Sequence, residues 1–374
     1  MTAHFPALLA SALLLASAPF AAPPPQAGVV HYVDDDAEHD PGPGDTAQSD
    51  PLEDGSPDHP FDAIQEAIDA ALPGDEVVVL DGTYTGAGNY ELKLKGKDIR
   101  VRSANGPSLC VIDCQQAGRA FQLGHPLETG TVEGFTLTGG RARFGGAIRC
   151  SGGGSPTIAN CVMRDNVALV HGGALYVRKS QPIVRNCSIE NNLARGSHGG
   201  GLYFAGTTAT VTSCLITGNV AGVTGAGIYT VDSAVTIRLC TLAENHSYAF
   251  GGGLAADYGQ PILESSILWQ NSVDISLGPQ ISSFHSTLLA TSCVVDGGLN
   301  DVLNLFSAIG WSGNNLVLDP LFVDAAAGDY HLSPASPCIN AGDPAYVAAP
   351  EETDIDGEPR VAGAAVDMGA DELP

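Results

Sequence analysis

The sequence has few basic residues and few charges of any kind. Of its 374 residues only 16 are Lys or Arg, against 42 Asp or Glu, and the formal net charge is −26 at pH 7. This balance argues against nucleic acid as a partner, because neutralising phosphates requires Lys and Arg. Charged residues make up 16% of the chain, below the usual quarter of residues, so few long helices are expected.

Long apolar runs are also absent, except for one close to the N-terminus. Residues 5–22 (FPALLASALLLASAPFAA) carry no charge and end in small residues, as the apolar part and cleavage site of a secretory signal do. Pro6 and Pro19 leave this run short compared with the ~20 residues that a membrane helix needs. The sequence predicts a signal peptide over 1–22 and a mature protein without a transmembrane segment, secreted or held at the cell surface. The alternative is a retained membrane anchor.

The next segment is acidic and has no basic residue. In the whole chain, Gly and Pro are frequent (46 and 24 residues), yet 44% of the residues are hydrophobic, so the protein as a whole is predicted to be neither disordered nor collagen-like. Residues 23–59 are predicted to be an acidic Pro/Gly-rich arm. Clustered carboxylates suit Ca²⁺, so calcium is the one cofactor that the sequence suggests, with Asp34, Asp35 and Asp36 as candidate ligands. A solvated acidic arm is the alternative. Asp354 and Asp356 in the stretch DIDGEPR suggest the same ion.

A repeat of 26 to 27 residues organises the middle of the chain. Glycine-rich motifs recur at Gly145, Gly172, Gly199, Gly225 and Gly251. A column of small residues recurs in a second register, at Cys161, Cys187, Cys214, Cys240 and then Ser266. Five residues after each of these comes an asparagine, at Asn166, Asn192, Asn219, Asn245 and Asn271. One such unit cannot bury its own apolar face, but stacked units can.

The repeat therefore predicts an all-β fold, a parallel β-solenoid whose coils lie ~4.8 Å apart. The Cys column is expected to point into the core. The Asn column is expected at a turn, where stacked amides pair along the axis. Residues 60–72 (PFDAIQEAIDAAL) read as a helix with Phe61, Ile64, Ile68 and Leu72 on one face, ended by Pro73. This helix is expected to cap the first coil.

Several stretches resemble proteins of the pectate-lyase-like superfamily. IANCVMRDNVALVHGGALYV resembles the repeats of right-handed parallel β-helices, and VEGFTLTGG and GDEVVVLDGTY resemble their early coils. The stretches DPLFVDAAAGDYHLSPASPCINAGDP and DIDGEPRVAGAAVDMGADE resemble the C-terminal region of bacterial choice-of-anchor surface proteins. The resemblance implies a right-handed single-stranded β-helix over 60–318 and an irregular C-terminal region over 319–374. It also implies an extracellular setting, often with a carbohydrate link.

The nine cysteines, and the histidines His171 and His198, each allow a structural and a functional interpretation. Stacked Cys side chains point in parallel, which suits a disulfide poorly, so a buried ladder of free thiols is expected. An oxidised set remains the alternative, because an exported protein could form disulfides. His171 and His198 precede consecutive Gly motifs and could share a metal or titrate as a pair. Two solvated turn histidines are the alternative.

Strand alternation places one further column on the outside of the solenoid. If the residue before it points inward, this column holds Arg149, Tyr176, Tyr203 and Tyr229. Three exposed stacked Tyr rings ended by an Arg would form a sugar-binding platform, because flat rings suit the apolar faces of sugars. A structural Tyr ladder that covers the sheet is the alternative.

Two classes of function remain open. The first is a secreted or cell-surface β-helix, monomeric, that binds polysaccharide or a cell-surface glycan or is structural, without clear catalytic residues. The alternative is a polysaccharide lyase or a glycoside hydrolase. The resemblance implies that a lyase would use an Arg or Lys as its base, whereas a hydrolase would need a carboxylate pair such as Asp165 and Glu190. The candidate bases are Arg149, Arg164, Arg178, Lys179, Arg185, Arg195 and Arg238.

Overall fold

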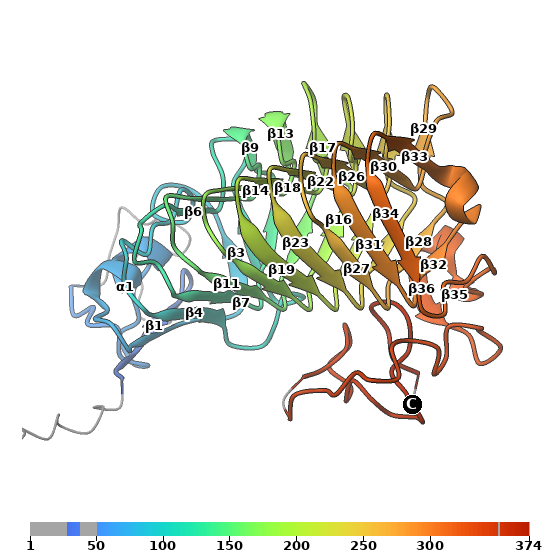
Figure 1. Cartoon of the computed structure of the whole chain (residues 1–374). Helices are drawn as coiled ribbons and strands as arrows, with labels where there is room; N and C mark the ends of the chain where they lie inside the picture. The colour runs from blue at the N-terminus through green and yellow to red at the C-terminus, as the bar shows by residue number, and fades with distance from the viewer. Residues whose placement is uncertain (1–27, 38–50, 351, 374) are drawn as a thin grey trace, which may run out of the picture.

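A computed structural model describes residues 28–37, 51–350 and 352–373. Short strands wind through successive coils and stack into long parallel sheets, with the N-terminal part at one end and the C-terminal part at the other (Figure 1). The predicted signal peptide and most of the acidic arm before residue 51 lie outside the described residues. Among the described residues, none of the helices has the length and apolar character needed to cross a membrane.

Four parallel sheets make up the solenoid, here named sheets A to D. Sheet A has eleven strands, in the order β1 (Val30–Val33), β2 (Glu76–Val79), β4 (Arg100–Ser103), β7 (Thr131–Glu133), β11 (Thr157–Ala159), β15 (Ile183–Arg185), β19 (Thr208–Thr212), β23 (Ala234–Arg238), β27 (Ile262–Glu264), β31 (Thr287–Thr291) and β34 (Ala308–Ser312). Sheet B has nine, in the order β3 (Gly82–Tyr84), β5 (Cys110–Asp113), β8 (Thr136–Thr138), β12 (Val162–Arg164), β16 (Ser188–Glu190), β20 (Leu215–Thr217), β24 (Thr241–Ala243), β28 (Ile267–Trp269) and β32 (Val294–Val295).

The other two sheets complete each coil. Sheet D has six strands, β9 (Arg141–Phe144), β13 (Val167–His171), β17 (Leu193–Ala194), β21 (Val220–Ala221), β25 (His246–Ser247) and β29 (Ser272–Val273). Sheet C has eight, β6 (Phe121–Leu123), β10 (Ile148–Ser151), β14 (Leu175–Arg178), β18 (Leu202–Ala205), β22 (Ile228–Val231), β26 (Leu254–Asp257), β30 (Ile281–Phe284) and β33 (Val302–Leu305). A complete coil thus runs through sheets A, B, D and C in turn. The predicted parallel β-solenoid is confirmed.

The corners between strands need backbone conformations that few residues adopt. At the turn from sheet D to sheet C, Gly172 has φ +68°, and a Cβ there would lie 2.4 Å from the carbonyl oxygen of Leu175. The recurrent glycines of the sequence therefore mark a corner with no room for a side chain. At the turn from sheet A to sheet B, Asn160 and Asn186 adopt the left-handed conformation, which asparagine tolerates well.

The N-terminal end differs in detail from the prediction. Helix α1 covers only Ile64–Ala70 and lies at this end of the solenoid (Figure 1). Ile64 and Ile68 are buried as expected, but Leu72 is 68% exposed, so its place on the buried face is wrong. The reason is Pro73, which disfavours helical backbone at the residue before it. Strand β1 pairs with β2, so part of the expected acidic arm is the first strand of sheet A.

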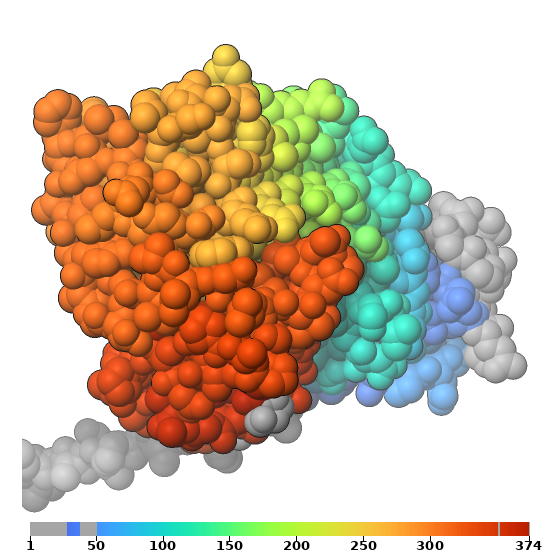
Figure 2. All heavy atoms as spheres, turned by 90° about the vertical axis from the view of Figure 1, so that its right-hand side faces the viewer, coloured from blue at the N-terminus to red at the C-terminus, as the bar shows by residue number. Residues whose placement is uncertain are grey.

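The C-terminal region folds back along the side of the solenoid. It begins with an antiparallel hairpin of β35 (Phe322–Asp324) and β36 (Asp329–Leu332), which a short 3₁₀ helix, η2 (Ala325–Ala327), joins. A second 3₁₀ helix, η1 (Gly298–Asp301), lies earlier in the chain and precedes β33. The remainder is irregular and packs against the lower part of the solenoid (Figure 2). Backbone N–H groups of this region donate hydrogen bonds to the corner between sheets A and B. Ala370 N donates to Oγ1 of Thr241, and Gly369 N donates to the carbonyl of Ser265.

Candidate functional site

The Cys column forms a buried ladder, as predicted. Cys161, Cys187, Cys214 and Cys240 are at most 1% exposed. Each Sγ lies 3.2 Å from the carbonyl oxygen two residues earlier in the chain. Burial raises the pKa of the Cys161 and Cys214 thiols well above the usual range, so these groups are poor nucleophiles. All four side chains are closed off from solvent, so the column packs the core.

The Asn column is a continuous chain of hydrogen bonds in the core. Asn166, Asn192, Asn219, Asn245 and Asn271 are between 0% and 4% exposed. The Oδ1 of each of the last four accepts from both the backbone N and the Nδ2 of the asparagine one coil earlier, at 2.9–3.0 Å. At the far end, Asn271 Nδ2 donates to Oε1 of Gln280. Every buried amide group is thus satisfied, which makes the ladder structural.

The Tyr column has the predicted register but not the predicted exposure. Arg149 pairs with Tyr176, Tyr176 with Tyr203, and Tyr203 with Tyr229 across sheet C. The Tyr rings stack at centroid distances of 5.1 and 5.3 Å. They are only 5–8% exposed, because the turns from sheet D lay His171 and His198 over them. The expectation of an open Tyr platform for sugars is therefore wrong, and these rings form a covered ladder.

The two histidines belong to this stack. Their rings lie 5.5 Å apart with an interplanar angle of 8°, and His198 stacks on Tyr229 at 4.3 Å. Parallel stacked rings do not direct their nitrogens at one ion, so this geometry does not support a shared metal. Burial lowers the pKa of His198 to about 4 and also lowers that of His171.

This stack predicts a loss of stability in acid. The folded protein keeps His198 neutral down to about pH 4, whereas an unfolded His binds a proton near pH ~6.5. Between these values the unfolded chain holds more protons, so the histidine's contribution to stability falls as the pH falls from 6.5 towards 4. We expect His198→Phe, which keeps the ring but cannot titrate, to show a smaller drop in Tm between pH 7 and pH 5 than the parent. His246→Phe, at a partly exposed histidine of sheet D, is the control, and parallel curves for parent and His198→Phe would contradict the assignment.

The basic residues considered for a lyase are spread around the solenoid. Arg149 and Arg178 lie on sheet C, Arg164 on sheet B and Arg185 on sheet A. The guanidinium of Arg238 stacks over the Tyr346 ring and lies 3.9 Å from Glu352. Arg195 follows β17 on sheet D, and Lys179 lies at the corner between sheets C and A. These side chains do not gather on one face of the described structure, so they do not form a lyase-like cluster.

An open groove, which the sequence did not point to, follows the corner between sheets C and A. It is a hollow of about 570 Å³ that crosses four coils and is lined by Lys179, Gln181, Thr208, Asp232, Tyr258 and Gln260 among others. A second hollow of about 370 Å³ on the face of sheet A shares Gln181, Thr208 and Ala234 with it. The two hollows therefore form one polar, elongated depression, hereafter the corner groove.

An exposed aromatic stack extends from this groove. The rings of Tyr258 and His285 lie 5.3 Å apart, and those of His285 and Phe306 lie 5.2 Å apart, each pair with an interplanar angle of 16°. Tyr258 is 56% and Phe306 is 80% exposed. Both residues have a positive φ, +54° and +60°, which is unusual and strained for a bulky side chain. We call these three residues the exposed stack.

The exposed stack carried a weak sequence signal. Lys179, Gly206, Asp232, Tyr258 and His285 each follow a corner glycine by seven residues. Extending the repeat by this offset places them in one column. Phe306 breaks the spacing, because the chain from His285 to Phe306 is five or six residues shorter than a regular coil. Only the structure shows that its ring continues the stack.

The acidic residues proposed for calcium lie in two different settings. One carboxylate oxygen from each of Asp34, Asp35 and Asp36 can be chosen so that all lie within 4.8 Å of one another. Burial, followed by the hydrogen bond with Asp36, raises the pKa of Asp34 to about 6. Oxygen ligands of this kind fit a hard cation, and calcium binding there stays a prediction.

Asp354, by contrast, is not available to an ion. It is fully buried, and its carboxylate accepts from the backbone N of Asp356, Glu358 and Glu372. The suggestion of a calcium ligand at Asp354 is therefore wrong. The carboxylate instead holds the irregular C-terminal segment in shape by satisfying three backbone donors.

Comparison with known proteins supports the fold. Residues 85–263 match the family described as right handed beta helix region. The solved structures that the chain matches include a pectate lyase, Pel9A (14% identity over 93% of this chain and 97% of that one, TM-score 0.48), and a XylC–xylose complex (11%, 77% and 70%, 0.45). A third is a rhamnogalacturonan lyase (12%, 79% and 91%, 0.43).

These similarities do not extend to an activity. Among curated proteins, none matches the sequence significantly. Identities of 11–14% with TM-scores below 0.5 transfer no catalytic residue to this chain. With its parallel sheets and the matched region, the chain folds as a right-handed parallel β-helix; the repeats predicted the solenoid and the resemblance its hand.

Proposed function

We propose that this protein is a secreted or cell-surface β-helix that binds an extended polysaccharide or cell-surface glycan along the corner groove. The observation that carries the proposal is the exposed stack of Tyr258, His285 and Phe306, which continues a polar groove across adjacent coils. Apolar side chains that are grouped together on a surface often mark a binding site. The three rings are stacked on one another at 5.3 and 5.2 Å, so a glycan lying parallel to the axis would run along their outer edges.

The groove supplies the polar half of such a site. Gln181, Thr208 and Gln260 offer hydrogen-bonding groups, and Lys179 and Asp232 offer one charge of each sign. The chain as a whole carries a formal charge of −26, which would repel a polyuronate in the absence of a bridging cation. A neutral glycan is therefore the favoured class. Export is proposed from the apolar segment 5–22, and the extracellular setting from the resemblance. The protein is proposed to act as a monomer.

Removing the exposed rings should weaken glycan binding without affecting the fold. We expect the double variant Tyr258→Ala/Phe306→Ala to lose about ten-fold or more in affinity, which corresponds to about 1.4 kcal/mol or more of binding free energy. Binding is measured by affinity electrophoresis and calorimetry against neutral and acidic polysaccharides. Tyr248→Ala, which removes a 61% exposed ring beyond β25 on another face, is the control. Equal losses in both variants, or no binding to any glycan tested, would refute the proposal.

The alternative function is a polysaccharide lyase that uses the same groove. It is favoured by one observation, that Lys179 is a candidate base and lines the groove. A lyase would produce chain ends with an unsaturated sugar, which absorb in the ultraviolet, and Lys179→Ala would abolish them. A hydrolase would produce saturated ends and would need a carboxylate pair. Incubation of the protein with the same polysaccharide panel therefore separates binding from both kinds of cleavage.

A further inference from the structure

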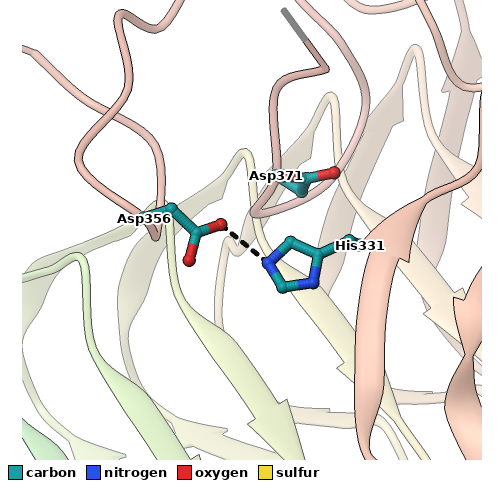
Figure 3. A group of neighbouring side chains, drawn as sticks. All are labelled: His331, Asp356 and Asp371. Carbon is teal, nitrogen blue, oxygen red and sulfur yellow. Dashed lines mark hydrogen bonds and ion pairs between the residues drawn. The ribbon is translucent and has the colours of Figure 1, made fainter.

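Three side chains from separate parts of the C-terminal region converge beside sheet B (Figure 3). His331 lies on β36, Asp356 in the loop after Asp354, and Asp371 near the end of the described chain. One candidate ligand atom from each residue can be chosen so that all three lie within 4.8 Å of one another. Nε2 of His331 is 2.8 Å from Oδ2 of Asp356. These groups play no part in the proposed glycan site.

The imidazole is held in the orientation that metal-binding histidines adopt. Nδ1 of His331 bonds Oδ1 of Asp329 on the same strand, and Nε2 bonds Oδ2 of Asp356, the contact that an ion would replace. Metal-ligating histidines commonly donate their second ring N–H to a carboxylate in this way, and the contact fixes the tautomer. The carboxylate of Asp371 and the backbone of Asp356 are also held by hydrogen bonds. Leu332 N donates to Oδ2 of Asp371 at 2.7 Å, and Asp356 N donates to Asp354.

The local charge is strongly negative. Asp329, Asp356 and Asp371 surround one imidazole, in a chain that already carries a formal charge of −26. Asp371 is only 7% exposed, so water screens its carboxylate poorly. A divalent cation placed among the three ligand atoms would balance the charges of Asp356 and Asp371 and relieve their mutual repulsion.

From this geometry we propose that His331, Asp356 and Asp371 bind a first-row divalent transition-metal ion of the Zn²⁺ type. The donor set selects this class, because one imidazole nitrogen with two carboxylate oxygens suits Zn²⁺ and its neighbours. Ca²⁺ takes six to eight oxygen ligands, so it fits this set less well. The ion would tie β36 to the irregular segment 353–373 and so hold two parts of the C-terminal region together.

The surroundings leave space for a further ligand. The same residues border a pocket of about 100 Å³ whose other walls include Leu215, Tyr330 and Ile355. Three protein ligands and an open position are the arrangement in which Zn²⁺ retains a water or another small ligand. The pocket is large enough for one or a few waters. The fourth ligand is therefore expected to be a water in this pocket.

The test uses untagged full-length protein freed of metal by a chelator. We expect calorimetry with Zn²⁺ to show one equivalent bound, and Tm to rise by about 3–6 °C at a hundred-fold excess over Kd. Co²⁺ as a substitute should give the intense visible bands of a four-coordinate site. His331→Gln and Asp356→Asn should each weaken binding at least ten-fold. Asp356 is 45% exposed, so its variant should fold even if the histidine variant does not.

A matched control is present in the same chain. His246 faces a single carboxylate, with Nε2 3.2 Å from Oδ1 of Asp274, and His246→Gln should leave the affinity unchanged. The proposal is overturned if the His331 and Asp356 variants bind Zn²⁺ like the parent. It is also overturned if His246→Gln loses as much affinity, or if the parent binds no stoichiometric ion. The glycan-binding result is independent of every one of these outcomes.

Discussion

Replacing Asn219 by alanine is expected to lower the free energy of unfolding by about 3–5 kcal/mol. The side chain is fully buried, and its Oδ1 accepts from both the backbone N and Nδ2 of Asn192. Its own Nδ2 donates to the carbonyl of Ile189 and to Oδ1 of Asn245. Alanine would leave donors on one side and acceptors on the other without partners, and each orphaned buried group costs roughly 1–3 kcal/mol.

Chemical denaturation of the parent and the variant measures this loss. Asn300→Ala, at an exposed position of η1, is the control and should change stability by less than about 0.5 kcal/mol. Asn219→Asp keeps the shape but replaces a donor with a buried carboxylate, so its loss should be at least as large. A loss below about 1 kcal/mol for Asn219→Ala would mean that water enters the gap and satisfies the neighbours.

The second large effect is expected at Asp354. Replacing it with asparagine removes one of two oxygens that accept from three backbone N–H groups. It also removes a negative charge near the buried guanidinium of Arg360, which is 1% exposed. Leaving a buried backbone donor without a partner costs roughly 1–3 kcal/mol, and the lost attraction to Arg360 adds to this cost. The cost should fall on the C-terminal region, because the solenoid's own hydrogen bonds are unchanged.

Hydrogen exchange followed by mass spectrometry distinguishes local from global loss. In Asp354→Asn, amides of 353–373 should exchange faster, while those of the Asn ladder keep their protection. Glu358→Gln, one turn away and exposed, is the control. Uniform acceleration throughout the chain would show that the C-terminal region and the solenoid unfold as one unit.

The repeat allowed much of the solenoid to be predicted from sequence. A fixed spacing of 26 to 27 residues brings equivalent positions into register, so the columns at Cys187 and Asn219 followed directly, as did the pairing of Tyr176 with Tyr203. What the period does not encode is how the turns between strands fold over a face. The turns that carry His171 and His198 lie on the Tyr rings, and that contact removed the expected platform.

The remaining differences arise where the period fails or where distant segments meet. Phe306 joins the exposed stack through a shortened coil, so no fixed offset locates it. His331, Asp356 and Asp371 lie up to 40 residues apart in an irregular region, and no local pattern indicates that they converge. The sequence suggested Asp354 as a calcium ligand, because a sequence does not show whether a carboxylate faces an ion or backbone N–H groups.

The uninterrupted Asn ladder also bears on how such a chain can change its length over evolution. Ser188 and Leu215 are register partners in adjacent coils, so joining Cys187 directly to Leu215 would remove one coil and bring Asn166 against Asn219. The Asn ladder would then run without a gap through the junction. Unequal recombination between repeats could therefore add or delete whole coils with little penalty, and would lengthen or shorten the corner groove one step at a time.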